Sequence, residues 1–282
     1  MKKISIITVN KDNSAGLRAT AQSIASQSCF SDIEWIVIDG YSSDDSVQVI
    51  REYESYIDYW VSEKDAGIYS AMNKGIRAAH GEYVIFRNSG DLMYDERVIE
   101  KFINHPTFGH YDYCSGITRV VSDKKIEYDF YPSPDLTVEA FYRWAMPHAS
   151  TFIKRSRFSE SLYDESMKIS ADTVHCFRDI IVNNASYAPL DFFVSIFEAY
   201  GISSNHENAA LGIIERDRGF KECLPPRIYD NIYYMHGKIS SRERRLIRYT
   251  WSRTWEYKVL CFVALLLNLP RRLWEKIHKV KR

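Results

Sequence analysis

Residues 34–39 read Glu-Trp-Ile-Val-Ile-Asp, a run of four large apolar side chains that ends directly in a carboxylate. Such a nearly unbroken apolar run is typical of a strand that is buried on both faces, as the strands of a parallel sheet are. Two later apolar stretches also run into an acid, at Asp65 and at Asp91. If all three stretches are strands of one parallel sheet, these two acids and Asp39 gather along its carboxyl edge, where open α/β folds place their ligands.

Strands and helices alternate over about the first ninety residues. A strand at Ile4–Val9 precedes a helix with apolar side chains at helical spacing, and a later helix at Ile68–Ala79 ends before Gly81, a plausible C-cap. This rhythm predicts an α/β fold with a right-handed, mostly parallel central sheet flanked by helices. Beyond residue 95 the pattern changes, since Tyr111–Val121 and Lys125–Tyr131 indicate an antiparallel extension. We expect three parts, residues 1–95, 96–215 and 216–282.

Composition favours a folded protein of the reducing cytosol. The chain has 282 residues, 45% of them hydrophobic, which is enough for one large α/β domain with an appendage. Its five cysteines are odd in number and contain no CxxC pair, so neither a disulfide framework nor a zinc site is predicted. The N-terminal apolar run Ile4–Val9 is too short for a secretory signal.

A sheet edge lined with carboxylates suits a divalent cation that bridges to a diphosphate, together with hydrogen bonds to a nucleoside. Each acid also has a purely structural interpretation. Asp91 follows Gly90 in what can be an ordinary turn, Asp39 can be a turn acceptor, and Asp65 can cap the helix that begins near Gly67.

Several motifs together carry a family resemblance. They are Thr8-Val9-Asn10, Trp35–Gly40, Ser62–Tyr69, Ala71–Gly75 and Phe86–Asp91, followed more thinly by Pro147–Phe152, Ile169–Asp172 and Gly201–Ser204. The chain resembles a family 2 glycosyltransferase with the GT-A fold, a Rossmann-like α/β fold. It is most similar to bacterial enzymes that build capsule, colanic-acid-type or O-antigen polysaccharides.

The resemblance implies a nucleotide-sugar site and a metal site. Asp39 and Asp65 would contact the nucleoside, with Thr8, Asn10, Asn73 and Asn88 as further nucleotide-sugar-binding residues. The family's metal motif is commonly Asp-x-Asp, whereas this chain has Ser89-Gly90-Asp91. Asp91 is then the motif's one carboxylate for Mn²⁺ or Mg²⁺, with His206 as a further ligand from a later loop.

The resemblance also implies an inverting displacement, which needs a general base on the acceptor side. Asp172 is the candidate base because family members place theirs at the start of the corresponding predicted helix. His148 is a second catalytic candidate, near the diphosphate, the metal or the acceptor. Asp172 can instead simply cap its helix, and a lone histidine is often a hydrogen-bonded structural residue.

We therefore expect a metal-dependent transferase that moves a sugar from a nucleotide donor, a UDP-sugar, to a lipid-linked oligosaccharide in surface polysaccharide biosynthesis. A sugar-nucleotide pyrophosphorylase is an alternative, but residues 10–14 lack the glycines of a triphosphate-binding loop. A non-catalytic membrane scaffold of a polysaccharide assembly complex is another, left open by the missing first acid of the metal motif.

The C-terminal segment is strongly basic and predicted to be helical. Residues 238–282 contain 13 of the 37 Lys and Arg but 3 of the 37 Asp and Glu. They enclose an apolar run, Val259–Leu269, that is too short to span a bilayer, with tryptophans among the charges. Attachment to the anionic inner face of the cell membrane is the leading interpretation. Docking on the protein's own core or on a second subunit remains an alternative, and no nucleic-acid motif accompanies the charges.

Overall fold

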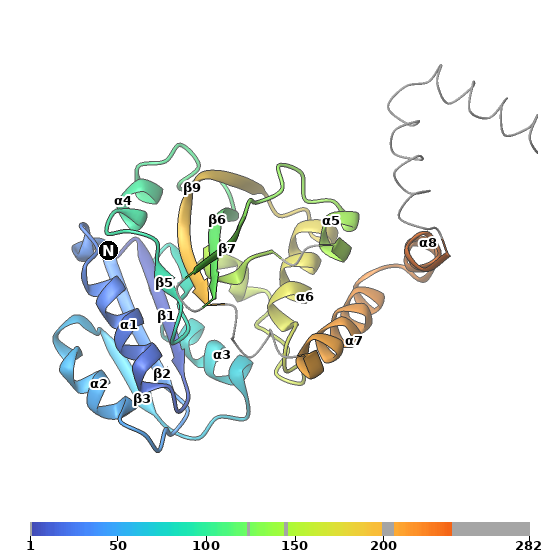
Figure 1. The fold of residues 1–282 in the computed structure, drawn as a ribbon. Coiled ribbons are helices and arrows are strands. Elements are labelled where there is room, and N and C mark those ends of the chain that lie inside the picture. The colour runs from blue at the N-terminus through green and yellow to red at the C-terminus, as the bar shows by residue number, and fades with distance from the viewer. Residues whose placement is uncertain (1, 123–124, 144–145, 199–205, 239–282) are drawn as a thin grey trace, which may run out of the picture. The chain divides into compact units, whose positions relative to one another are not determined.

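The computed structural model describes residues 2–122, 125–143, 146–198 and 206–238. The chain divides into two compact units, Met1–Cys223 and Leu224–Arg282, and each is considered by itself. The first unit contains a single large sheet flanked by helices (Figure 1).

The elements follow in chain order. The strands are β1 (Ile4–Asn10), β2 (Ile33–Asp39), β3 (Tyr59–Ser62), β4 (Tyr83–Phe86), β5 (Leu92–Met93), β6 (Tyr113–Ser122), β7 (Lys125–Phe130), β8 (Thr151–Lys154) and β9 (Tyr187–Glu198). The helices are α1 (Ser14–Ala25), α2 (Ser46–Glu52), α3 (Ile68–Ala78), α4 (Val98–Ile103), α5 (Val138–Arg143), α6 (Ala171–Phe177), α7 (His206–Cys223) and α8 (Pro226–Lys238).

The first four strands are parallel, as the sequence predicts. They lie in the order β3-β2-β1-β4, so that Ile4 of β1 pairs with Ile33 of β2 on one side and with Tyr83 of β4 on the other. Every residue of β1, β2 and β4 is buried. The nearly continuous apolar runs in these strands are explained by burial on both faces of the sheet.

The second half of the sheet is mixed, and the expected antiparallel hairpin is confirmed. β7 pairs antiparallel with β6, while β8 joins β4 to β6 with antiparallel pairing on both sides. β9 then pairs parallel with β6 and antiparallel with the short β5. The sequence patterns did not predict β8 or β9. The predicted helix that carries Asp172 is α6, which ends at Phe177 and passes into one π-helical turn.

Two faces of the sheet are covered by different helices. On one face, Trp35 and Ile85 belong to a core with side chains from α1, α2 and α4. On the other face, α3 lies against β1 and β2. The approach of α3 is close because Gly75 faces Ile7, where a Cβ on the glycine would lie 2.4 Å from the Cγ2 atom of the isoleucine.

The second unit is described only as far as residue 238, where it contains α8. The predicted basic tail, including the apolar run at 259–269, lies outside the described residues. None of the helices within the described ranges is long and apolar enough to cross a membrane.

The contact between α3 and β1 makes a first prediction. Replacing Gly75 by alanine should lower the free energy of unfolding by about 1–3 kcal/mol, because the added methyl overlaps a β-branched side chain that cannot easily rotate away. Urea unfolding measures the change.

Arg77→Ala, on the exposed side of the same helix, is the control and should change stability by less than about 0.5 kcal/mol. Combining Gly75→Ala with Ile7→Ala should cost less than the sum of the single changes. An alanine at position 75 that leaves stability unchanged would contradict the close approach.

Candidate functional site

Three acids lie at the carboxyl edge of the parallel strands. Asp39 is the last residue of β2, Asp65 follows the end of β3, and Asp91 follows the end of β4. Since β2, β3 and β4 all run parallel to β1, their carboxyl ends share one edge of the sheet. The structure therefore brings together the loops that the sequence analysis singled out.

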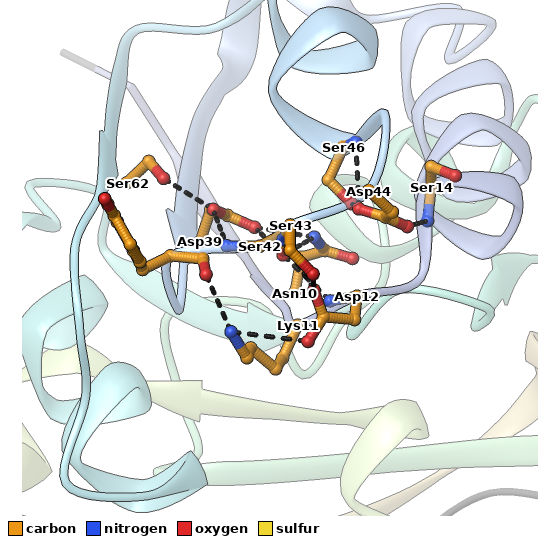
Figure 2. A network of polar contacts seen from close by, with 11 residues as sticks. Asn10, Lys11, Asp12, Ser14, Asp39, Ser42, Ser43, Asp44, Ser46 and Ser62 are labelled. Carbon is orange, nitrogen blue, oxygen red and sulfur yellow. Dashed lines mark hydrogen bonds and ion pairs between the residues drawn. The ribbon is translucent and has the colours of Figure 1, made fainter.

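Asp39 is fully buried and surrounded by hydrogen-bond donors (Figure 2). Its Oδ1 accepts from Asn10 Nδ2 at 2.7 Å and from the Ser42 hydroxyl at 2.5 Å. Its Oδ2 accepts from the backbone N–H of Ser42 at 3.0 Å and from the Ser62 hydroxyl at 2.6 Å. Burial alone would raise the pKa of Asp39, but these hydrogen bonds outweigh it and lower the pKa.

A carboxylate has about four lone-pair directions, and in Asp39 all four are used. Its carboxylate therefore ties together β1, the loop after β2 and the end of β3. A direct contact with a nucleoside would have to displace one of these donors, so the arrangement favours Asp39 as the residue that fixes the surrounding loops.

The loops after β1 and β2 are interlocked by further polar contacts (Figure 2). Asp12, whose φ of 47° is in the left-handed region, accepts from the backbone N–H of Ser43 at 2.7 Å. Asp44 accepts from the N–H of Ser14 at the start of α1 and from the Ser46 hydroxyl, and these bonds lower its pKa to about 2. These hydrogen bonds join the two loops to each other and to the start of α1.

Asp65 lies beside this network. Its Oδ1 is 2.5 Å from Nζ of Lys74 on α3, and the same ammonium group is 2.7 Å from Glu63. The Asp65 hydrogen bond and then that of Glu63 raise the pKa of Lys74. The Oδ2 of Asp65 would lie 3.4 Å from a Cβ at Gly40. The Asp65 carboxylate therefore lies within van der Waals distance of the residue that follows Asp39.

The loop from residue 88 to residue 91 is anchored to α1. The Thr20 hydroxyl donates to the carbonyl of Asp91 at 2.9 Å and accepts from the N–H of Gly90 at 3.0 Å. Gly90 has a φ of 107°, a conformation that side chains disfavour. Asn13 Nδ2 donates to the carbonyl of Ser89 at 3.0 Å. These contacts place Asp91 beside the loop that follows β1.

Asp91 contrasts with Asp39 electrostatically. Burial raises its pKa to about 6, and the nearby positive charge of Arg87 and a backbone N–H of Asn88 offset only part of that effect. The amide Oδ1 of Asn88 is buried and has no hydrogen-bond partner in the described part of the chain. The Asp91 carboxylate, which has few hydrogen-bond donors, and the unpaired amide oxygen of Asn88 are therefore only three residues apart in the sequence.

These oxygens fit a hard divalent cation, which prefers carboxylate and amide oxygen ligands. Among the residues that the structure describes there is no group of three His, Cys, Asp or Glu side chains that would hold a metal ion by themselves. Asp91 and Asn88 would therefore supply part of a coordination shell and leave the rest to ligand phosphates and water.

Arg87 lies directly beneath this loop and is fully buried. Its guanidinium donates to the carbonyls of Phe86, Ala149 and Val194, the last at 3.1 Å. Burial lowers its pKa to about 10, while the charge of Asp91 opposes the shift. The side chain joins β4, β9 and the 3₁₀ turn His148–Ser150 beneath the edge.

Asp172 lies in the first turn of α6 and reaches the α3 side of the site. The Tyr69 hydroxyl on α3 donates to its Oδ1 at 2.8 Å. Burial, followed by the Asp172 charge, raises the pKa of Tyr69 well above its ordinary value, so this hydroxyl stays protonated. Asp172 is thus linked to the half of the chain that carries the three edge acids.

His148 packs between Phe86 of β4 and Tyr163. Its ring stacks on Phe86 with centroids 4.5 Å apart, and its Nε2 is 3.2 Å from the Tyr163 hydroxyl. Burial lowers the pKa of His148, the Asp172 charge opposes this, and the Arg87 charge adds to it. The imidazole is therefore neutral at pH 7, and its pKa depends on the charges of both Asp172 and Arg87.

Other residues named from the sequence take structural positions. Thr8 is buried in the core, where its hydroxyl accepts from Trp35 Nε1 at 3.0 Å. Asn73 is also buried and uses its amide to bond both the N–H and the carbonyl of Tyr163. Neither side chain is directed at the edge loops by these contacts. His206 begins α7, but its side chain lies outside the described residues.

Sequence reasoning missed Tyr69, Lys74 and Arg87 as parts of the site. Tyr69 and Lys74 are four and nine residues beyond Asp65, on a predicted helix that starts at the sheet edge, which is the signal that could have found them. Arg87, a charge directly after an apolar strand, was a second signal. Its burial depends on carbonyls from β9 and the turn before β8, which no local pattern predicts.

Comparison with known proteins agrees with this geometry. The family model described as Glycosyl transferase family 2 matches residues 4–166. An uncharacterised glycosyltransferase of Mycobacterium tuberculosis is 28% identical over 212 residues, which cover 74% of this chain and 79% of that protein. The Staphylococcus aureus poly(ribitol-phosphate) beta-N-acetylglucosaminyltransferase TarP is 34% identical over 109 residues, 37% of this chain and 33% of TarP.

Solved structures share the fold. S. aureus TarS 1–349 in complex with UDP-GlcNAc has a TM-score of 0.60 at 16% identity, covering 86% of this chain and 77% of that one. The mannosyltransferase PcManGT from Pyrobaculum calidifontis, in complex with GDP-Man and Mn²⁺, has a TM-score of 0.59 at 15% identity, covering 96% and 82%. These likenesses confirm the expected GT-A fold. Since the family model spans more than half of the sequence, the chain belongs to glycosyl transferase family 2.

Proposed function

We propose that this glycosyltransferase is an inverting, metal-dependent enzyme that transfers a sugar from a UDP-sugar to a hydroxyl of a lipid-linked oligosaccharide in surface polysaccharide biosynthesis. The observation that supports it most strongly is that two acids at the same edge of the sheet, Asp39 and Asp91, have opposite surroundings. Asp39 is saturated with hydrogen bonds, whereas Asp91 is short of them and has a raised pKa.

The nucleotide end of the donor would bind over the interlocked loops after β1 and β2. Asn10 and Asp65 border this region, and Asp39 keeps the loops in place. Relatives support a nucleotide-sugar donor, since TarS binds UDP-GlcNAc and PcManGT binds GDP-Man. Thr8 and Asn73 then act by supporting the site, because their polar atoms are already engaged inside the protein.

The diphosphate end would lie over the 88–91 loop. Asp91, with the Asn88 amide oxygen, would hold Mn²⁺ or Mg²⁺, with His206 as a further ligand. Such a cation, when bound, neutralises charge on the leaving diphosphate. PcManGT contains Mn²⁺ together with its nucleotide sugar, which supports a cation in this chain.

On the acceptor side, Asp172 would take the proton from the attacking hydroxyl. The Tyr69 hydrogen bond fixes one of its oxygens. His148, neutral at pH 7, would then act by positioning or hydrogen bonding. Residue 147, next to this histidine, lines a cavity of about 520 Å³ whose walls include the aromatic and proline rings of residues 128–134. Its size suits an acceptor saccharide.

This arrangement supports the division into a donor half, residues 1–95, and an acceptor half, residues 96–215. The basic segment within residues 216–282 would attach the enzyme to the anionic inner face of the cell membrane, where a lipid-linked acceptor is found. The name of TarP states a poly(ribitol-phosphate) substrate, which supports a polymeric acceptor. A homodimer is the alternative use of the tail's apolar run.

A second prediction concerns Asp91 and Asp172. In a thermal-shift panel of nucleotide sugars with Mn²⁺, one UDP-sugar should raise the melting temperature by several degrees, because ligands that bind the native state stabilise it. Asp91→Asn should fold normally but lose the Mn²⁺-dependent part of this shift. Asp172→Asn should keep the full shift while hydrolysis of that donor falls by about 100-fold or more.

Asp191→Asn, an exposed carboxylate on β9, is the matched control and should behave like the unchanged protein. Unaltered turnover in Asp172→Asn would remove Asp172 as the base. Donor binding without release of any nucleoside diphosphate would favour the scaffold interpretation instead.

A third prediction tests the basic C-terminal tail. The full chain should sediment with vesicles that contain anionic phosphatidylglycerol, and a chain ending at residue 237 should stay in solution, because the removed segment carries most of the clustered positive charge. Neutral phosphatidylcholine vesicles are the control, and the donor-induced thermal shift checks that the shortened chain is folded. Equal sedimentation of both chains would exclude membrane attachment through the tail.

A further inference from the structure

A buried carboxylate on α7 binds the backbone just before Asp172. Glu215 is 7% exposed. Its Oε1 accepts from the N–H of Lys168 at 2.8 Å, and its Oε2 accepts from the N–H groups of Ile169 at 2.9 Å and Ser170 at 3.1 Å. Three consecutive backbone donors are therefore held by one side chain that is more than forty residues away in sequence.

Two glycines on the same face of α7 allow this approach. Gly212 and Gly219 are three residues before and four residues after Glu215, so all three share one stripe of the helix. A Cβ at Gly212 would lie 3.0 Å from Cγ2 of Ile169, and one at Gly219 would lie 2.5 Å from Cγ2 of Val174. The backbone of α7 thus packs directly against both the 168–170 segment and α6.

Ser170 adds a fourth link. Although it stands at the N-cap of α6, its hydroxyl makes no capping bond and instead donates to the carbonyl of Gly212 at 2.9 Å. Five residues beyond Glu215, Phe220 is fully buried and stacks on Phe177 of α6 with centroids 3.9 Å apart. The start of α6 is therefore fixed by α7 and not by its own cap.

Asp172 is consequently held from two sides. Tyr69 of α3 binds its carboxylate directly, and α7 fixes the backbone two residues before it. The second constraint determines where the first turn of α6 begins, and with it where the Asp172 side chain can reach. A displacement of about 1 Å in a catalytic group can lower a rate by about two orders of magnitude.

We propose that Glu215 is a positioning residue that sets the location of Asp172 for proton transfer by holding the backbone N–H groups of residues 168–170. This inference rests on the proposed function, in which Asp172 is the base. It assigns a role in the reaction to α7, which lies beyond the residues matched by the family model.

Both oxygens of Glu215 are needed for this role. A glutamine would retain one acceptor and present an N–H₂ group to a backbone N–H, so at least one of the three bonds would be lost. Glu215→Gln keeps the size of the side chain and is therefore the variant least disruptive to folding. Glu222→Gln, an exposed change on the same helix, is the matched control.

The test uses the full chain, Mn²⁺ and the UDP-sugar selected by thermal shift, with hydrolysis of that donor as the reaction. We expect Glu215→Gln to lower kcat by about tenfold or more, with the donor KM and the Kd for UDP within about twofold of the unchanged protein. Amide hydrogen exchange of residues 168–172 should be faster in this variant below its melting temperature. Glu222→Gln should alter none of these quantities.

Glu215→Gln and Asp172→Asn should also be non-additive, because both act on one proton transfer. A Glu215→Gln protein with faster exchange at 168–172 but an unchanged kcat would overturn the inference while leaving Asp172 as the base. Undiminished turnover in Asp172→Asn would overturn the base assignment itself, and with it this role for Glu215. A fall in melting temperature alone, with kcat intact when measured well below it, would show that Glu215 serves only stability.

Discussion

Hydrogen bonding to the Asp39 carboxylate is the interaction on which the site depends. A buried, charged carboxylate is costly unless donors replace its hydration, and here Asn10, Ser42 and Ser62 supply them from three separate segments. Because the movement of any one of those segments would cost Asp39 at least one of its four hydrogen bonds, this carboxylate holds the loops at the carboxyl edge together. The parallel register of β1, β2 and β3 brings the donors within reach.

The acids of this protein fall into two groups by their surroundings. Asp39, Asp44 and Glu34 accept several hydrogen bonds and have lowered pKa values, so they maintain structure. Asp91 has a raised pKa and few donors, which leaves its oxygens available to a cation. Glu215 accepts three backbone N–H groups, and in our proposal it positions a second available acid, Asp172.

The positively charged side chain of Arg87 is also buried and lies close to these acids. Arg87 is surrounded by backbone carbonyls from β4, β9 and the turn at residues 148–150, and its charge acts on both Asp91 and His148. It therefore couples the edge of the parallel strands to the antiparallel half of the sheet. His148, stacked on Phe86 and close enough to feel the charge of Asp172, lies where these two halves meet.

The apolar run at residues 34–39 and the strand–helix rhythm around it were enough to predict the parallel sheet, its carboxyl edge and the three acids along it, because burial on two faces leaves a local record in the chain. The hydrogen-bond partners of those acids could be identified only from the tertiary structure. Three sets of hydrogen bonds illustrate this: those to Asp39, the one from Tyr69 to Asp172, and those from residues 168–170 to Glu215. They join segments between 23 and 103 residues apart. Such contacts depend on how helices and strands pack, and packing is not encoded in any short stretch of sequence.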